Sequence, residues 1–441
     1  MFYLIKKIMK KNILLKQSFI YLSSNILNAS IPFVLLPVFS YYLSTEEYGK
    51  IAIFQILLSG LNAIIGLNTT GAASRKFFDT KDNKILIQYN NSSFIILFLS
   101  SIVIFILFYL FSDSFISFFN IPKEWLVFAI FSSTLDYILR FKLTQLQIRN
   151  KAFQYGAIQV SNSFLSFTIS IFLIVFLNFG AEGRIYGILI TSFVTAILCF
   201  ISLYKNNLLS TKESSLFYIK DNLYFGIPLA PHILGVFLLS SIDRFIINKE
   251  YGLSEAGIYM MAVQVSLAII LVFDALNKTF MPYLFQQLTN VNMNTEIKNK
   301  IIIYSYIFFI FCIISGLLAS IISPYIISFI AGSKYLKAQE IVFWLCIGQS
   351  FQGLYLVVTN YITYVKKTYL LSLITIISGC INIILIFILI RKYELIGVSY
   401  AFCISMFIRF ILTWAVSNWV YPMPWNILKL TYFNNKHKKR I

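Results

Sequence analysis

The hydrophobic positions of this chain are gathered into long continuous runs separated by short polar segments. A helix of about 20 residues, rising ~1.5 Å per residue, crosses the ~30 Å hydrocarbon core of a bilayer. Two stretches, 124–146 and 396–420, reach this length when a few internal charges are tolerated. Ten more stretches of at least 18 residues contain no Asp, Glu, Lys or Arg: 17–45, 51–74, 85–112, 152–181, 185–204, 222–242, 256–273, 301–333, 341–365 and 368–390. The pattern predicts about twelve transmembrane helices.

These runs do not have the pattern of a membrane β-barrel. Barrel strands alternate polar and apolar residues over about ten positions, whereas these runs are continuous and roughly twice as long. The fold class predicted is therefore an all-α polytopic membrane protein. The longer polar segment from Tyr204 to Asp221 follows the sixth span. We expect it to link two six-helix lobes, residues 1–210 and 211–441.

Charged residues are scarce and follow the predicted loops. Lys and Arg number 36 against 17 Asp and Glu, a net charge of +19, and charged residues make up 12% of the chain. This share is about half of that in soluble domains, which excludes a soluble enzyme. With the N-terminus inside, inside segments hold 26 Lys and Arg, outside loops hold 9, and Arg409 lies within a span. This positive-inside pattern predicts cytoplasmic termini and contact with membrane lipids, not nucleic acid.

The sequence contains none of the motifs that support covalent chemistry. It has no Gly-rich phosphate loop, no Ser-His-Asp set and no clustered His or Cys residues. The five cysteines all fall inside predicted spans without metal-ligand spacing. We therefore expect no enzyme activity, no cofactor and no metal site.

Arg409 is the sharpest feature at membrane depth. It lies near the middle of the last span, with no acidic residue within one helical turn on either side. An ionised group in hydrocarbon costs several kcal/mol, so Arg409 needs a partner from elsewhere. One interpretation is a central aqueous cavity in which the guanidinium binds an anionic substrate such as a phosphate. The alternative is an interhelical salt bridge or contact with protein carbonyls.

Two acidic residues inside predicted spans have a basic residue four positions later. Asp136 precedes Arg140 in the fourth span, and Asp274 precedes Lys278 in the eighth. Residues four apart share one helix face, so both pairs are expected to be self-neutralising. Asp136 lies deepest, at roughly 18 Å from the outer end of its span, which makes a gating or ion-coupling role the alternative. Arg140, nearer the inner headgroups, also fits a snorkelling anchor.

Three further candidates lie in the seventh span. Asp243 and Arg244 are adjacent at its outer end, so they point about 100° apart and are not expected to neutralise each other along one face. They would close an outer gate against another helix, or Arg244 would line the cavity, or both are plain interfacial residues. His232 would carry protons in ion-coupled transport or pack through a hydrogen bond.

Polar and proline residues mark the first helix of each lobe. Asn25 and Asn28, with Ser24, form a polar stripe that either lines a hydrophilic cavity or bonds to a neighbouring helix. Proline kinks a helix and frees carbonyl groups, so prolines are candidate hinges as well as packing kinks. The four prolines concerned are Pro32, Pro37, Pro228 and Pro231.

Three segments carry family-like motifs. They are Ile31 to Phe54 (IPFVLLPVFSYYLSTEEYGKIAIF), Gly66 to Asp79 (GLNTTGAASRKFFD), and Phe225 to Ala262, which contains IPLAPHILGVFLLSSIDRFIIN and GLSEAGIYMMA. They resemble the bacterial O-antigen and lipid-linked oligosaccharide flippases, the Wzx-type branch of the multidrug, oligosaccharidyl-lipid and polysaccharide superfamily. Arg75 and the pair Asp243-Arg244 match recurrent charged positions of that pattern. The chain departs from it at Tyr41, where relatives often place an arginine.

The resemblance implies a MATE-like fold with a central cavity that opens alternately to either face. Its implied function in lipopolysaccharide or related polysaccharide biosynthesis is to flip an undecaprenyl-pyrophosphate-linked oligosaccharide across the bacterial inner membrane, from the cytoplasmic to the periplasmic face. Implied partners are this lipid-linked glycan, membrane lipids, and a polysaccharide polymerase with other assembly proteins.

Three other functions fit the sequence less well. A multidrug cation antiporter of the same fold would need acidic cavity residues, and the deep charges here are as much basic as acidic. A peptidoglycan-precursor flippase would be expected to have two extra helices. A polysaccharide polymerase would need a sizeable outside loop, which the predicted topology does not provide.

Overall fold

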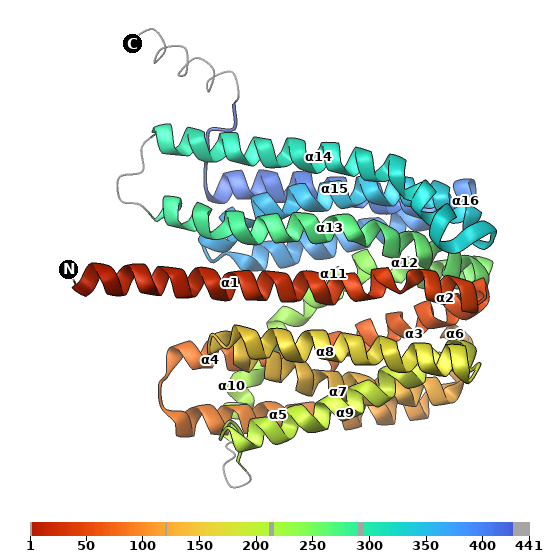
Figure 1. Ribbon diagram of the computed structural model, residues 1–441, viewed down its shortest axis with the longest axis horizontal. Coiled ribbons are helices and arrows are strands. Elements are labelled where there is room, and N and C mark those ends of the chain that lie inside the picture. Colours follow the sequence, from red (N-terminus) through yellow and green to blue (C-terminus); the bar gives the residue numbers. More distant parts are fainter. Residues whose placement is uncertain (1, 120, 211–215, 290–294, 427–441) are drawn as a thin grey trace. The chain divides into compact units, whose positions relative to one another are not determined.

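The computed structural model describes residues 2–119, 121–210, 216–289 and 295–426. This part of the chain is helical and contains no strand (Figure 1). Nine helical segments within it have the length and apolar composition to cross a membrane. The predicted all-α polytopic fold is confirmed, whereas the cytoplasmic location of the termini stays a prediction.

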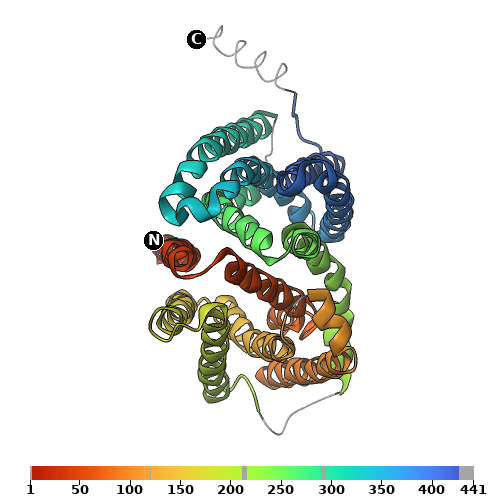
Figure 2. The same ribbon diagram turned by 90° about the vertical axis from the view of Figure 1, so that its right-hand side faces the viewer.

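The chain divides into two compact units. Unit 1 comprises residues 1–261 with 328–336, and unit 2 comprises 262–327 with 337–441. The predicted lobe boundary between 210 and 211 falls beside residues outside the described part, and the division into 1–210 and 211–441 stays a prediction. Within each unit the long helices run roughly side by side, as the end-on view in Figure 2 shows.

Helices α1 to α12 belong to unit 1. Their bounds are α1 Phe2–Val34, α2 Leu36–Tyr42, α3 Thr45–Ile64, α4 Thr69–Asp79, α5 Asn83–Leu110, α6 Ser112–Phe119, α7 Lys123–Ile148, α8 Ala152–Ile171 followed by a π-helical turn Phe172–Phe176, α9 Gly180–Lys205, α10 Leu216–Gly226 followed by a 3-10 turn Ile227–Leu229, α11 Ala230–Ser240 and α12 Ile242–Tyr251. Three of the predicted spans are each built from two helices here, namely α1 with α2, α3 with α4, and α10 with α11.

Four long helices build unit 2. They are α13 Leu253–Leu288, α14 Thr295–Ala331 followed by a 3-10 turn Gly332–Tyr335, α15 Leu336–Tyr364 and α16 Thr368–Val420. Three of them, α13, α14 and α15, begin or end in unit 1. The longest, α16, contains two predicted spans, because Glu394 has a left-handed φ of 51° that breaks the helix between them. Close beside this break, Gly397 packs against the Leu389 carbonyl, where a Cβ would collide.

The first helix packs its polar stripe against α8. Ser24 faces Gly156 so closely that a Cβ there would collide with the serine hydroxyl. One turn further along, Ser163 Oγ donates to Asn28 Oδ1 at 2.5 Å. The stripe therefore serves contact with a neighbouring helix, which was one of its two predicted roles. Asn25 is half-buried beside it.

All four candidate hinge prolines lie at helix interruptions. Pro32 falls in the last turn of α1 and Pro37 in the first turn of α2, on either side of the break at Leu35. Pro228 lies in the 3-10 turn after α10, and Pro231 is the second residue of α11. Proline lacks the amide hydrogen that a continuous helix requires, which explains why the chain breaks at these points.

The α3–α4 interruption meets the α10–α11 interruption inside unit 1. Gly66, Leu67 and Asn68 have left-handed φ values of 77°, 45° and 55°. The freed Gly66 amide donates to Ser100 Oγ at 3.0 Å. Gly226, just before the proline turn, lies so close to the Leu67 carbonyl that a Cβ would collide with it. The non-helical turn between α3 and α4 is thus packed against the backbone at the end of α10, where Gly226 leaves room for the Leu67 carbonyl.

A reciprocal glycine crossing joins the starts of α3 and α13 in unit 1. A Cβ on Gly49 would collide with the Leu253 carbonyl oxygen, and a Cβ on Gly257 would collide with the Thr45 carbonyl oxygen. Each glycine therefore meets the carbonyl four residues before the other glycine. Thr45 Oγ1 and Ser254 Oγ are hydrogen-bonded at 2.7 Å across the crossing. These segments, LSTEEYG and LSEAG, are similar in sequence and also pack symmetrically.

Replacing Gly257 by alanine should open this crossing. The new methyl group would meet backbone atoms, which cannot rotate away, and such overpacking costs about 1–3 kcal/mol. A Thr45→Cys, Ser254→Cys pair should cross-link readily in a protein whose exposed Cys380 is replaced by serine. Adding Gly257→Ala should reduce the cross-linking rate by roughly 5- to 150-fold, as that energy implies.

Gly60→Ala in α3 is the matched control. A Cβ at Gly60 would meet only the Phe237 side chain, at an ordinary 3.5 Å. It should leave cross-linking unchanged. Equal cross-linking in the Gly257→Ala protein would show that the helices do not depend on this contact.

Candidate functional site

Arg409 belongs to the second half of α16 and lies buried in unit 2. Its guanidinium contacts α15 and the first half of α16. The residue is 5% exposed. Its guanidinium carbon sits 3.8 Å from the centre of the Tyr355 ring. Nη1 donates to Gln352 Oε1 at 2.9 Å, and Nη2 donates to Thr375 Oγ1 at 3.4 Å. A stacked ring and two neutral oxygens thus orient the guanidinium.

The charge of Arg409 is not neutralised by the protein around it. Among the residues that the structure describes, no ion pair includes Arg409. Its Nε is buried and has no hydrogen-bond acceptor among the described residues. The alternative of an interhelical salt bridge is therefore not formed in the described part, whereas the bond to the Gln352 side-chain carbonyl is a contact of the other kind that was predicted. A buried cation with a spare donor is an arrangement that suits an anionic ligand.

Polar side chains surround this arginine. Ser378, one turn after Thr375, and Ser405, one turn before Arg409, are buried, and their hydroxyl oxygens have no hydrogen-bond partner in the part of the chain that the structure describes. Thr413, one turn after Arg409, is also buried and donates to the Arg409 carbonyl at 2.7 Å. The two halves of α16 thus carry hydroxyl groups along the faces that hold the guanidinium.

The expectation that Asp243 and Arg244 do not neutralise each other is wrong. Arg244 Nε lies 3.2 Å from Asp243 Oδ1, and both residues are buried. The helix breaks at Ser241, so Asp243 lies in the first turn of α12, where its carboxylate also accepts from the Arg244 amide at 2.8 Å. The long arginine side chain folds back toward this turn and donates to the Ser240 carbonyl. The prediction assumed a continuous helix and did not include this break.

The two pairs spaced four apart behave differently. Asp274 and Lys278 form the expected ion pair, with 2.5 Å between Oδ2 and Nζ. Asp136 and Arg140 do not. Asp136 instead accepts from Ser192 Oγ of α9 at 2.8 Å. Arg140 donates to Asn62 Oδ1 of α3 at 3.0 Å, so the fourth span uses its charges to bind two other helices. Tertiary partners outcompete the local pairing here.

The remaining candidates are Arg75, Pro231 and His232. Arg75 in α4 is exposed, lies 3.9 Å from Asp79 and contacts the Phe225 ring at 5.2 Å. His232 and Pro231 belong to α11, but their side chains lie outside the described part, and the proposed proton role of His232 stays a prediction.

Arg184 is a buried cation that the sequence pattern does not reveal. Arg184, early in α9, directly precedes the apolar run 185–204 and was counted among the outside-loop charges. In the structure it is 7% exposed. The sequence signal available was weak, because an arginine at the edge of a span usually marks the membrane interface.

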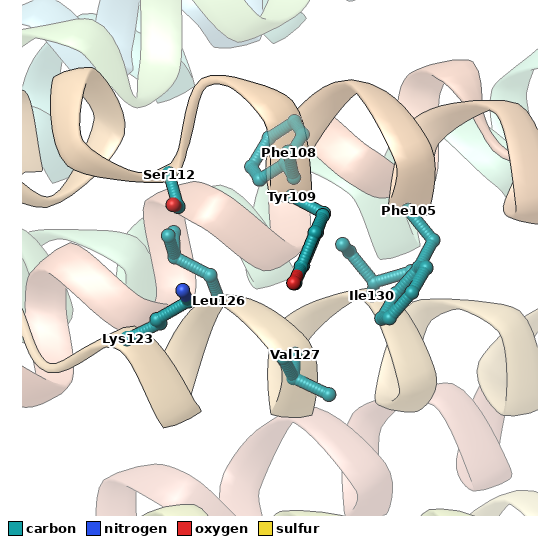
Figure 3. A pocket seen from close by; sticks show the side chains of 8 residues that line it. All are labelled: Phe105, Phe108, Tyr109, Ser112, Lys123, Leu126, Val127 and Ile130. Atoms are coloured by element: carbon teal, nitrogen blue, oxygen red, sulfur yellow. The ribbon is translucent and has the colours of Figure 1, made fainter.

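A surface groove between α5 and α7 is lined by mainly apolar side chains (Figure 3). Phe105 and Tyr109 from α5 face Leu126 from α7 across it, and Lys123 Nζ lies 5.2 Å from the Tyr109 ring at its rim. None of the predicted site residues lines it. Phe105 and Tyr109 are exposed, as side chains facing lipid are expected to be.

The fold of this chain is similar to that of solved membrane proteins. It matches an inward-facing multidrug resistance MATE family transporter of the MOP superfamily with a TM-score of 0.67 at 15% identity, covering 95% of this chain and 99% of that one. It matches the lipid II flippase MurJ in an inward closed conformation with a TM-score of 0.68 at 19% identity, covering 93% and 87%. The protein is therefore a polytopic membrane protein that shares the fold of these two proteins.

The sequence assigns the family of this chain. Residues 14–288 match the polysaccharide biosynthesis protein family, and the chain belongs to it. A relative from Haemophilus influenzae named Lsg locus putative protein 1 is 28% identical over 378 residues, which cover 83% of this chain and 89% of the relative. An uncharacterized membrane protein of the same organism is 24% identical, with 83% and 88% covered.

Replacing Arg409 by methionine should stabilise the ligand-free protein. Methionine keeps a long side chain over Tyr355 and removes a buried charge that has no ion-pair partner in the described part. Replacing buried ionic groups by apolar ones of similar volume often adds about 1–4 kcal/mol. The midpoint of thermal unfolding in detergent should therefore rise.

Arg391→Met is the matched control, because Arg391 lies on the same helix with an exposed side chain. It should leave the unfolding midpoint nearly unchanged. A lowered midpoint in the Arg409→Met protein alone would mean that the arginine holds the helices together and is not kept for a ligand.

Proposed function

We propose that this protein flips an undecaprenyl-pyrophosphate-linked oligosaccharide, an O-antigen or related repeat unit, from the cytoplasmic to the periplasmic face of the bacterial inner membrane. The observation that carries the proposal is Arg409, a buried guanidinium without an ion-pair partner in the described part of a polysaccharide biosynthesis family protein. A pyrophosphate supplies the missing negative charge. Its polyprenyl tail stays in lipid while the polar part crosses.

The substrate requires a polar, cationic path through hydrocarbon. Moving a pyrophosphate or a glycan out of water without hydrogen bonds is prohibitive, so the protein must replace water along the way. Arg409 offers a planar fork of donors that matches phosphate oxygens. The hydroxyl groups of Thr375, Ser378 and Ser405 stand on the same helix and supply neutral hydrogen-bonding groups for sugars or water.

Alternating access provides the mechanism of the proposal. The glycine crossing between α3 and α13 closes unit 1 at the end that the charge pattern places outside, with the buried Asp243-Arg244 pair on the helix that precedes α13. The proline-containing interruptions are the points where helices bend. A single binding site that opens to one face and then to the other needs no covalent step.

Other predicted residues take supporting roles in this proposal. Arg75, exposed on α4 at the predicted inside end, attracts the anionic substrate from the cytoplasmic leaflet. Asn28 and Asn25 sit on the helix whose interruption at Pro32 and Pro37 forms one hinge. Assembly proteins that act on the glycan, such as a polymerase, would receive the flipped unit.

Deletion and complementation in the protein's own host test the proposal. Loss of the gene should remove surface polysaccharide and leave undecaprenyl-linked oligosaccharide on the cytoplasmic side. The wild-type gene should restore export, Arg409→Ala should not, and Arg409→Lys should restore part of it, because lysine keeps the charge but not the fork. The loss of charge-assisted hydrogen bonds, about 1.5–3 kcal/mol, implies a roughly 10- to 150-fold weaker substrate interaction.

Arg391→Ala is the control and should restore export fully, because the Arg391 side chain is exposed. Membrane levels of each variant are measured alongside. Normal surface polysaccharide with altered sensitivity to cationic drugs in the deletion strain would contradict the proposal and favour the multidrug antiporter.

A further inference from the structure

Unit 1 contains a polar cavity of about 210 Å³ where α3, α7 and α9 begin. The starts of these helices coincide with three predicted outside loops, 46–50, 113–123 and 182–184. The cavity has room for several water molecules, at ~30 Å³ each, or for one sugar ring in their place. Its charged and aromatic lining residues are Glu47, Lys50, Trp125, Phe179 and Glu182.

Trp125 lines the cavity with a polar group that the protein leaves unpaired. The residue is 4% exposed, and its ring packs edge-on against Phe54 with 6.2 Å between the ring centres. Its backbone amide donates to the Pro122 carbonyl at 3.1 Å, so the start of α7 fixes its position. The indole N–H makes no hydrogen bond to a described residue. A buried indole N–H usually has a partner, which a molecule in the cavity would supply.

Glu47 keeps one carboxylate oxygen for its own helix and leaves the other unused. Oε2 accepts from the Ser44 amide at 2.8 Å and from Ser44 Oγ at 3.0 Å, which caps α3. Oε1 lies against Gly180, where a Cβ would collide with it, and Gly180 has a left-handed φ of 54°. No described residue donates to Oε1. The cap therefore holds the side chain while Oε1 remains available to a ligand.

Two more charged groups add an acceptor and donors to the cavity. Glu182, in the first turn of α9, is exposed and forms no ion pair with a described residue. Lys50 Nζ lies 3.0 Å from Glu46 Oε1, but an ammonium has three donors and can also donate into the cavity. The two lining carboxylates and one ammonium leave one net negative charge. An acidic ligand is thus disfavoured.

Donors and acceptors in one cavity match hydroxyl groups, because a hydroxyl both donates and accepts. A simple cation would use the carboxylates but neither the indole N–H nor the ammonium. Phe179 is 46% exposed and offers an aromatic ring to the apolar face of a sugar. We propose that this cavity is a carbohydrate-binding subsite, which holds one uncharged sugar residue of the lipid-linked glycan. That the sugar belongs to this glycan rests on the proposed function.

Binding of methyl glycosides to the purified full-length protein tests the inference. The probes are the methyl glycosides of glucose, galactose, mannose and N-acetylglucosamine, titrated by saturation-transfer NMR in a detergent without a sugar head group. At least one should bind. Methyl glucuronide should bind more weakly, because its carboxylate meets a net negative charge.

Two variants should weaken binding of the sugar. Glu182→Gln should weaken it about 5-fold, because hydrogen bonds to a carboxylate are stronger than those to an amide, and should reduce the discrimination against glucuronide. Trp125→Phe keeps a ring but loses the N–H donor, and should weaken binding roughly 2- to 10-fold.

Glu124→Gln is the matched control. Glu124 lies in the first turn of α7, next to Trp125, but it is exposed and does not line the cavity. This variant should bind the sugar as the wild-type protein does. Glu182 is also exposed, so Glu182→Gln should keep the wild-type unfolding midpoint, which is measured alongside.

The outcomes separate the inference from the proposed function. If no methyl glycoside binds, or if Glu182→Gln and Trp125→Phe bind the sugar as the wild-type protein does, the inference is wrong, while the proposed function still rests on Arg409. Binding of methylammonium in place of a sugar would also overturn it. If the sugar binds here but the deletion strain keeps its surface polysaccharide, the cavity binds carbohydrate and the proposed function fails.

Discussion

The hydrocarbon core of a bilayer supplies no hydrogen-bond partner, so every polar group at that depth must be satisfied by the chain itself. This constraint explains why the described part is helical throughout. It also explains where the helices are interrupted. The amide freed at Gly66 is taken by the Ser100 hydroxyl, and the turn that contains it packs against the proline turn after α10. The helices are thus interrupted at points where another part of the chain packs against the interruption.

The same constraint makes the two arginines informative. Arg244 and Lys278 each pair with a carboxylate of the protein. Arg409 and Arg184 find a ring and neutral oxygens but no ion pair in the described residues. A protein that keeps such uncompensated charges carries a cost in stability. Under the proposed function, the binding of an anionic substrate offsets this cost at Arg409.

The sequence predicted the helices well because hydrophobic length is a direct consequence of bilayer thickness. It also identified Arg409, because isolation from acidic residues is visible along a single helix. It did not predict which partners the other charges take. The pairing of Asp243 with Arg244 depends on a helix break at Ser241, and Asp136 prefers Ser192 of another helix to Arg140 on its own. Arg184 was missed because burial of a residue at the edge of a span is decided by tertiary packing.

The most direct test of the central claim is the rate of flipping in proteoliposomes for two substrates with the same polyprenyl chain and glycan, one joined by pyrophosphate and one by a neutral linkage. The account predicts that the wild-type protein flips the pyrophosphate-linked lipid much faster, and that Arg409→Met removes the difference. Equal rates for the two lipids with the wild-type protein would contradict the claim that the buried arginine is kept to bind an anionic substrate.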